Sequence, residues 1–324
     1  MRPPVPLLVL CLFATCRTAP QGRALELFDG ATLAGWRALG DARYSVDDGC
    51  ILGEVGGGGQ SFLVSERTFG DFVLELDVKN ELPGNSGIQV RSRVRDDGRL
   101  QGYQIEIDPS PRAWSGGLYD EARRGWLDDL AGDDVARAAF RPGEWNRYRI
   151  ECRGAWIRAW VNGVPTADHL DALDLEGVIG LQVHSGNDTR VRWRDLRLVD
   201  LGTRAWRDVP VSLPWARVHV EGDGRAARFV VRPDPARPKA LEFRVDFGGE
   251  IRTLQRVVDA LEDPEPIVLN VLWQDRRWAV HAEDLDTTWS GLLDSEQSAR
   301  AEVALSVGAG HTILAAATLG PPER

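Results

Sequence analysis

The chain has 324 residues, and 43% of them are hydrophobic, which is enough for one large or two modest domains with their own cores. The formal net charge is -10 and the isoelectric point is about 5.1. Nucleic acids and anionic membrane surfaces are bound through clustered positive charge, so this balance excludes both as partners.

The first residues are typical of an export signal. A weakly positive start leads into an apolar run from Val5 to Ala14, far shorter than the roughly 20 residues of a membrane-spanning helix. The run ends in Leu12-Phe13-Ala14-Thr15-Cys16, which resembles an imperfect bacterial lipobox with Cys16 as the lipidated residue. We expect residues 1–16 to be a signal peptide. The mature protein is then a periplasmic or cell-envelope lipoprotein tethered only by its lipid, or a secreted protein after ordinary cleavage.

Two cysteines remain after the signal, Cys50 and Cys152. In an oxidising compartment this even pair is a candidate disulfide, which would contribute roughly 4 kcal/mol in the chain-entropy model. The alternative is two small buried hydrophobic side chains. Neither interpretation makes them catalytic or metal-binding, because no second Cys or His lies at metal-ligand spacing.

Residues 25–202 read almost entirely as short strands. Phe72 to Val78 alternates apolar and polar residues, as a half-buried antiparallel strand does. Another alternating segment ends at Val161, and the Asn162-Gly163 pair that follows predicts a tight hairpin, since both central positions of a type I′ turn need positive φ. About ten such strands, with no helix-length pattern between them, favour a two-sheet antiparallel β-sandwich.

Two of these strands, within residues 85–108, carry an unusual polar face. Residues at alternate positions share one side of a strand, so this face is expected to hold amides, a guanidinium and carboxylates together. The segment 180–186 repeats the pattern. The side chains in question are Asn85, Gln89, Arg91, Gln104, Glu106, Asp108, Gln182 and His184. Such a set suits the hydroxyl groups of a polyol, and the alternative is an ordinary solvated sheet face.

A long segment from Trp114 to Ala139 has little periodicity beyond a possible helical turn near Asp134 to Ala138. We expect it to form a rim over one end of the sheet, where binding loops usually lie. Its Tyr119 and Asp120 are candidate substrate-binding residues.

The second part, residues 203–324, is expected to be a smaller, accessory β-rich domain of unknown function. Pro210 and Pro214 mark its start, and most of it reads as strands. Leu254, Val257, Val258 and Leu261 recur at helical spacing, which predicts one short helix from Thr253 to Leu261.

Six short motifs in order resemble the 3-keto-disaccharide hydrolase domain family, whose fold is a concanavalin-like jelly roll. Each motif alone is weak, but their order across residues 25–202 makes the resemblance specific. The motifs are Leu27-Phe28-Asp29-Gly30 with Gly35-Trp36, Asn85-Ser86-Gly87-Ile88, Gly102-Tyr103-Gln104-Ile105-Glu106-Ile107, Gly117-Leu118-Tyr119, Glu144-Trp145-Asn146 with Val161-Asn162-Gly163, and Ile179-Gly180-Leu181-Gln182-Val183-His184.

The resemblance implies activity on glycosides already oxidised to a ketone at C3. A base removes the acidified proton on C2, the enolate expels the C1 substituent, and the resulting 2-hydroxy-glycal is hydrated. His184 suits the base, Arg91 the enolate oxygen and Glu106 the leaving-group acid. The chain departs from the family pattern at Val183 and Gln104, so the acid assignment stays open between Glu106, Asp108 and Asp120.

Two other functional classes remain open at this point. One is a non-catalytic, lectin-like carbohydrate-binding module on the same sandwich, and the other is a structural or adhesion protein. An enzyme needs titratable groups that converge on one point, and His184, Glu106 and Arg91 favour it. No cofactor and no metal site are indicated, although a divalent cation held by ligands from separate loops would escape such a reading.

Overall fold

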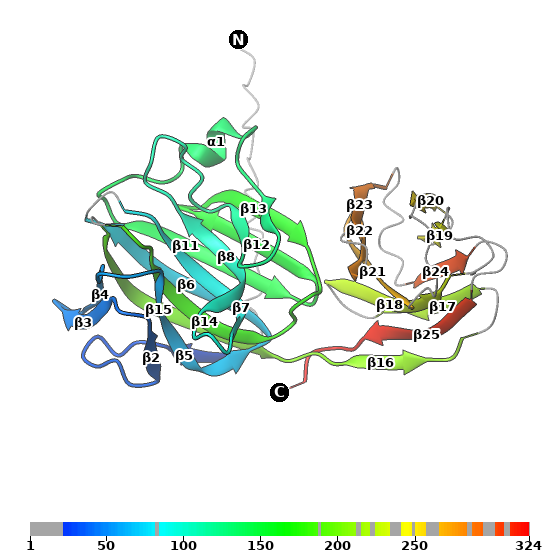
Figure 1. The fold of residues 1–324 in the computed structure, drawn as a ribbon, viewed down its shortest axis with the longest axis horizontal. Coiled ribbons are helices and arrows are strands. Elements are labelled where there is room, and N and C mark those ends of the chain that lie inside the picture. The colour runs from blue at the N-terminus through cyan, green and yellow to red at the C-terminus, as the bar shows by residue number, and fades with distance from the viewer. Residues whose placement is uncertain are drawn as a thin grey trace, which may run out of the picture.

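The computed structural model describes residues 22–81, 84–186, 189–211, 215–220, 224–233, 241–247, 250–256, 266–283, 287–293, 302–307 and 312–323. The predicted signal peptide and Cys16 lie outside these ranges. The fold is all-β, with two groups of strands side by side (Figure 1). None of the helices in the described ranges is long and apolar enough to cross a membrane.

The first group forms two antiparallel sheets, so the predicted two-sheet sandwich is confirmed. One sheet has the order β13-β12-β11-β6-β15-β4-β3, with β1 paired to β15, and the other has the order β10-β9-β8-β7-β14-β5-β2. Their strands are β1 (Arg23–Glu26), β2 (Trp36–Leu39), β3 (Arg43–Asp47), β4 (Cys50–Glu54), β5 (Ser61–Phe69), β6 (Asp71–Asn80), β7 (Ser86–Val94), β8 (Leu100–Ile107), β9 (Leu118–Glu121), β10 (Gly125–Asp128), β11 (Asn146–Arg153), β12 (Trp156–Val161), β13 (Val164–Leu170), β14 (Gly177–Val183) and β15 (Arg190–Gly202).

The sheets enclose one hydrophobic core because each strand alternates its side chains. On β6, Leu74, Leu76 and Val78 are buried, while the intervening residues are partly exposed. The Asn162-Gly163 hairpin forms as predicted: both residues have positive φ, and they join β12 to β13. The only helix in the described part of this group is α1 (Asp134–Arg137), at the predicted helical turn.

The second group also forms two antiparallel sheets, ordered β16-β25-β18-β21-β22-β23 and β17-β24-β19-β20. Thr203 and Glu323 are bridged by two backbone hydrogen bonds, so both ends of this group lie at the junction (Figure 1). The strands are β16 (Trp206–Val209), β17 (Trp215–His219), β18 (Arg225–Arg232), β19 (Leu241–Asp246), β20 (Ile251–Arg256), β21 (Ile267–Gln274), β22 (Arg277–Ala282), β23 (Thr287–Leu292), β24 (Glu302–Val307) and β25 (Thr312–Leu319).

The predicted helix from Thr253 to Leu261 is wrong where the structure describes it. Ile251–Arg256 is the strand β20, which pairs with β19 along its whole length. Leu254 is buried opposite Phe243 in the core of this group. The spacing of apolar residues did not reveal that β19 is available to pair with this segment. Pairing with a neighbouring strand overrides a local helical periodicity. Residues 257–261 lie outside the described ranges.

The predicted disulfide is also wrong, since Cys50 and Cys152 are both free and buried. Cys50 begins β4 and Cys152 lies near the end of β11, with β6 and β15 between the two strands. Three inter-strand spacings place them at least about 14 Å apart, whereas a disulfide needs Cα atoms within about 7 Å. The alternative of two buried hydrophobic side chains describes them.

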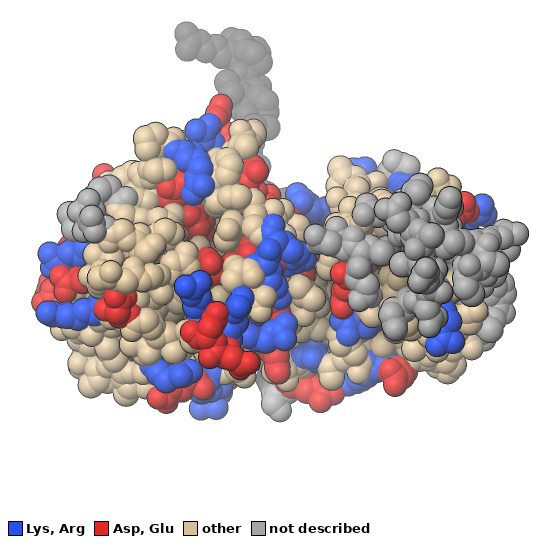
Figure 2. All heavy atoms as spheres, in the orientation of Figure 1, with Lys and Arg blue, Asp and Glu red and all other residues tan. Residues whose placement is uncertain are grey.

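Charged side chains on the outer face of the eight-stranded sheet are paired with one another. The Glu151 carboxylate, only 7% exposed, forms ion pairs with Arg149, Arg153 and Arg158. On the face of the molecule in Figure 2, basic and acidic side chains are interspersed. Acidic and basic groups therefore neutralise each other locally.

Candidate functional site

A pocket of about 400 Å³ lies on the outer face of the seven-stranded sheet. It gathers side chains from four strands and the loops beside them, because alternate residues of β8, β9 and β14 point away from the core. The lining residues are Gln60, Asn85, Gln104, Glu106, Asp108, Arg112, Tyr119, Glu121, Trp126, Gln182 and His184. Seven residues predicted from the sequence line it together: Asn85, Gln104, Glu106, Asp108, Tyr119, Gln182 and His184. Gln89, predicted to bind substrate, is fully buried and does not line the pocket, but it is hydrogen-bonded to Gln104.

Glu106 is held at the base of the pocket by neutral donors on both carboxylate oxygens. Asn85 Nδ2 donates to Oε1 at 2.5 Å, and Gln104 Nε2 donates to Oε2 at 3.0 Å. Behind Gln104, Gln89 Nε2 donates to its Oε1 at 2.6 Å, and Ser92 Oγ donates to Gln89 Oε1 at 2.6 Å. Burial raises the pKa of Glu106, although these amides and the nearby arginine favour the charged form.

Arg112 supplies positive charge beside this carboxylate. Its Nε donates to Asp108 Oδ2 at 2.8 Å, and its Nη2 lies 3.4 Å from Glu106 Oε1. The guanidinium also lies over the rings of Trp114, at 4.9 Å, and Trp126, at 5.1 Å. Burial alone would raise the pKa of Asp108, but hydrogen bonds from Ser110 and Arg112 outweigh it and lower that pKa.

His184 follows β14 and reaches the pocket from the other side. Its Nδ1 lies 2.8 Å from the carbonyl oxygen of Ser185. A carbonyl only accepts, so Nδ1 carries the proton and Nε2 keeps its lone pair in the neutral ring. Burial raises the pKa of Glu121, and the charge of His184 opposes this rise. The imidazole of His184 and the carboxyl group of Glu121 therefore face the same cavity.

The Gln182 amide is fully buried in the pocket wall. Neither its nitrogen nor its oxygen has a hydrogen-bond partner among the described residues. A buried amide without partners is costly, so it is a natural point for ligand hydroxyl groups to complete. Gly87 leaves room for the Gln104 side chain, because a Cβ at that position would overlap it.

The prediction that Arg91 shares an open polar face with Gln89 is wrong. The register of β7 shifts between Val90 and Arg93, and Arg91 has a φ of +50°. This bulge turns the fully buried Arg91 side chain toward the other sheet, where Nε donates to the carbonyl oxygen of Gly70 at 2.8 Å and Nη1 donates to that of Gly154 at 2.6 Å. Its remaining partner is Asp71, at 3.0 Å. Arg91 therefore joins turns of the scaffold and does not line the pocket.

Asp120 also lies outside the pocket. It sits between Tyr119 and Glu121 on β9, and consecutive residues of a strand point to opposite faces. Its carboxylate is fully buried and binds Arg123 and Arg124.

The sequence prediction missed Gln60, Arg112, Glu121 and Trp126. Glu121 carried a usable signal, since it lies two residues after Tyr119 and so shares its face. Arg112 and Gln60 lie in loops without periodicity, and nothing in the local sequence marked them.

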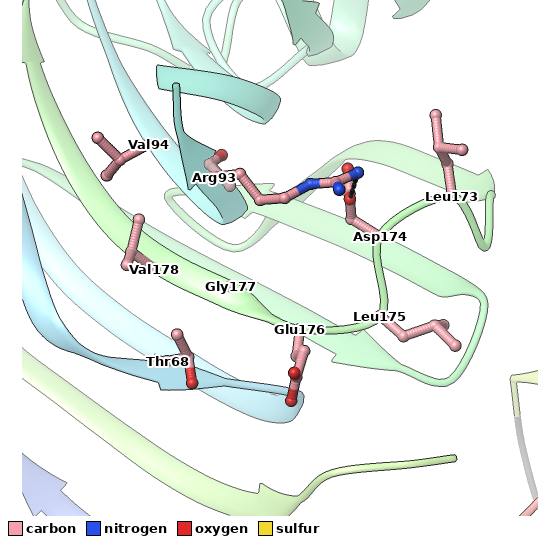
Figure 3. Close-up of a pocket in the computed structure, with 10 residues that line it drawn as sticks. Thr68, Arg93, Val94, Leu173, Asp174, Leu175, Glu176, Gly177 and Val178 are labelled. Carbon is pink, nitrogen blue, oxygen red and sulfur yellow. Dashed lines mark ion pairs between the residues drawn. The ribbon is translucent and has the colours of Figure 1, made fainter. Parts of the chain in front are cut away.

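A larger hollow of about 500 Å³ lies elsewhere on the same sheet (Figure 3). Its polar lining centres on the ion pair between Arg93 and Asp174, at 2.6 Å. No histidine lies in its wall, and both oxygens of the buried Asp174 are already engaged by arginines. The smaller pocket is therefore the better candidate site. Within the described ranges, no cluster of three His, Cys, Asp or Glu side chains could hold a metal ion.

Comparison with known proteins gives one curated relative, a 3-keto-disaccharide hydrolase of Bacteroides thetaiotaomicron that is 36% identical over 39% of this chain. The match spans about half of that relative, 51% of its length. Among solved structures, a Parabacteroides distasonis protein provisionally described as a glycosyl hydrolase covers 55% of this chain and 100% of its own, with 21% identity and a TM-score of 0.43. The carbohydrate-binding module CBM66 from Bacillus subtilis covers 51% of this chain and 96% of its own, with 17% identity and a TM-score of 0.42.

The family comparison covers the first group of strands except for the last three residues of β15. Residues 23–199 match the 3-keto-alpha-glucoside-1,2-lyase-like domain family, including every strand that lines the pocket. The resemblance inferred from the six sequence motifs is thereby confirmed, and the chain belongs to the 3-keto-alpha-glucoside-1,2-lyase-like domain family.

Proposed function

We propose that the chain is an exported enzyme that acts on 3-keto-glycosides, abstracting the C2 proton and eliminating the C1 substituent. The observation that carries the proposal is the convergence of His184, Glu106 and Arg112 on one pocket beside the unpartnered Gln182 amide. A base, an acid and a fixed positive charge are the groups that this chemistry needs.

The reaction begins with the C2–H bond. His184 Nε2 takes the proton, and the electron pair forms the C2=C3 bond of an enolate whose negative charge rests on the C3 oxygen. Arg112 is suited to stabilise that oxygen, because a guanidinium presents several N–H donors and a positive charge to an oxyanion. It replaces Arg91 in the role predicted from the sequence.

Elimination completes the first half of the reaction. The C3 carbonyl forms again, the C1=C2 double bond appears, and the bond from C1 to the leaving oxygen breaks. Glu106 is suited to protonate that oxygen, since burial raises its pKa. Addition of water across C1=C2 then returns the free 3-keto sugar. Glu121, whose pKa burial also raises, is a second group placed to transfer a proton.

The pocket also has an aromatic wall suited to a sugar ring. Tyr119 and Trp126 pack edge to face at 5.1 Å between centroids, and Trp114 packs on Trp126 at 4.8 Å. The same wall would serve a non-catalytic carbohydrate-binding module, which remains the second candidate.

The test is release of a chromogenic aglycone from a 3-keto-glucoside, measured beside the parent glucoside. We expect release only from the keto sugar, because without the ketone the C2 proton is too weakly acidic. His184→Gln should slow release by about 10²–10⁴-fold, the usual contribution of a positioned base. Tight binding of both sugars with release from neither would establish the binding module instead. Full activity of His184→Gln would move the base to Glu106 or Glu121.

A further inference from the structure

One wall of the candidate site is the β9–β10 hairpin, which supplies Tyr119, Glu121 and Trp126. The hairpin lies at the edge of its sheet, where β10 pairs only with β9. β9 pairs with β8 over four residues, and each residue of β10 is only partly buried. Such a short edge hairpin is marginal by itself in water. Other contacts must set the position of this wall.

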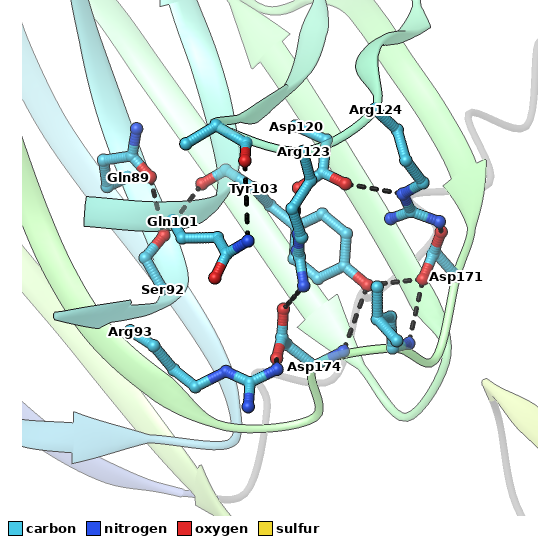
Figure 4. Close-up of polar contacts among 12 residues, drawn as sticks. Gln89, Ser92, Arg93, Gln101, Tyr103, Asp120, Arg123, Arg124, Asp171 and Asp174 are labelled. Carbon is cyan, nitrogen blue, oxygen red and sulfur yellow. Dashed lines mark hydrogen bonds and ion pairs between the residues drawn. The ribbon is translucent and has the colours of Figure 1, made fainter. Parts of the chain in front are cut away.

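The buried side of the hairpin carries a closed ring of ion pairs and hydrogen bonds (Figure 4). Asp120 binds both arginines of the hairpin turn: Oδ1 lies 2.7 Å from Arg123 Nη2, and Oδ2 lies 2.5 Å from Arg124 Nε. Each arginine also forms a second ion pair: Arg123 Nη1 lies 2.6 Å from Asp174 Oδ2, and Arg124 Nη1 lies 2.7 Å from Asp171 Oδ2. We call this set the aspartate–arginine ring; it consists of Asp120, Arg123, Arg124, Asp171 and Asp174. The hydroxyl group of Tyr103 completes it by linking Asp171 to Asp174.

Tyr103 closes the ring from the central part of the sheet. Its hydroxyl group donates to Asp171 Oδ1 and accepts from the backbone N–H of Asp174, at 3.2 Å. Tyr103 belongs to β8, while Asp171 and Asp174 lie in the connection between β13 and β14, which passes from one sheet to the other. The ring therefore ties the edge hairpin to a central strand and to the opposite sheet.

The same connection is supported from outside by the second group of strands. Leu170 and Ala172 pack in one cluster with Leu272 of β21 and Ala279 of β22. The residues on either side of Asp171 are thus packed against the second group.

The charges of the ring are buried, and its third aspartate, Asp174, is also paired with Arg93 outside the ring. The side chains of Asp120, Asp171 and Asp174 are at most 6% exposed, and Arg123 and Arg124 are 12% and 18% exposed. Burial alone would lower the pKa of Arg124, but Asp171 and Asp120 outweigh it and raise that pKa. Removing one partner leaves an uncompensated buried charge, which is strongly destabilising.

We propose that the aspartate–arginine ring is a positioning device for the aromatic wall of the candidate site. Asp120 is fixed on the buried face of β9, so its neighbours Tyr119 and Glu121 must point into the pocket. The members of the ring are positioning residues, since none of them lines that pocket. The kinetic part of the test rests on the proposed function, and the structural part does not.

The structural test is hydrogen–deuterium exchange of the full chain carrying Asp171→Asn. This change keeps the shape of the side chain but removes one of the two carboxylate charges that Arg124 faces, leaving that of Asp120. We expect exchange in peptides covering residues 118–128 to rise at least about tenfold, while peptides of β6 keep the wild-type rate. Glu151→Gln is the matched control, because it removes another buried carboxylate with arginine partners, on the other sheet. It should leave residues 118–128 unchanged.

The kinetic test uses the same two variants and the chromogenic 3-keto-glucoside. A displaced aromatic wall loses contacts with the sugar, whereas Glu106 on β8 and His184 after β14 keep their places. KM should therefore rise about tenfold, and kcat should change less than KM. Wild-type exchange in the hairpin of Asp171→Asn, or equal changes in the Glu151→Gln control, would overturn the proposal. If Asp171→Asn does not fold, Arg124→Lys is measured in the same way. If the wild type releases no aglycone, the proposed function fails, while the exchange data still decide the role of the ring.

Discussion

Two arginines of this chain should respond in opposite ways to the same substitution. Arg91→Met removes hydrogen bonds to the carbonyl oxygens of Gly70 and Gly154 and an ion pair with Asp71, all inside the scaffold. Arg112→Met removes a charge that is 42% exposed and lies in the pocket. We expect the first to lower stability and the second to lower turnover.

The expected sizes follow from burial. Arg91 is fully buried, and its loss leaves two buried carbonyl groups without a donor, at about 1–3 kcal/mol each. Asp71 is not left without a partner, because its ion pair with Arg204, at 2.6 Å, remains. The free energy of unfolding should therefore fall by about 3–5 kcal/mol, the usual cost of breaking one buried ion pair. Arg112→Met should change stability by less than about 1 kcal/mol because its ion pairs are partly solvated. It should lower kcat by about 10²–10³-fold, as expected for loss of one donor to a developing oxyanion.

Stability would be measured by urea unfolding monitored by fluorescence. Turnover would be measured as the initial rate on a chromogenic 3-keto-glucoside, at a temperature where each variant is folded. The reasoning is refuted if Arg91→Met keeps wild-type stability but loses turnover a hundredfold. It is equally refuted if Arg112→Met turns over normally.

Three further predictions concern the pocket and the cysteines. Burial makes ionisation of Glu121 cost more in the folded protein than in the unfolded chain, so its pKa is higher in the folded state. The stability of the wild type should therefore fall as pH rises through this raised pKa. The melting temperature of Glu121→Gln should equal that of the wild type at lower pH and exceed it increasingly as pH rises through that range. Gln182→Leu should leave the melting temperature unchanged or raise it, and should raise KM about tenfold by removing donors and acceptors meant for ligand hydroxyl groups; an unchanged KM contradicts this role. Alkylation of the unfolded chain without reductant should label both Cys50 and Cys152, and a peptide cross-linked through them would show the free-thiol assignment to be mistaken.

Much of the scaffold and most of the pocket could be predicted from the sequence. Strict alternation identified the buried face of β6, and the Asn162-Gly163 pair identified a hairpin, because both signals depend on local geometry alone. The same alternation placed Gln104 and Glu106 on one face of β8. The order of six short motifs was sufficient for the family.

The remaining features depended on contacts between segments that are distant in the chain. A bulge in β7 turned Arg91 away from the pocket. A neighbouring strand paired with Ile251–Arg256, which includes the start of the helix predicted from Thr253 to Leu261. Arg112 came from a loop with no pattern, yet it holds the position beside Glu106 that was predicted for Arg91. Local sequence determines which side of a regular strand a residue faces. Only the tertiary structure decides where a strand is irregular, which edge it pairs with and which loop lies over its face, because those outcomes depend on packing against residues far away in the chain.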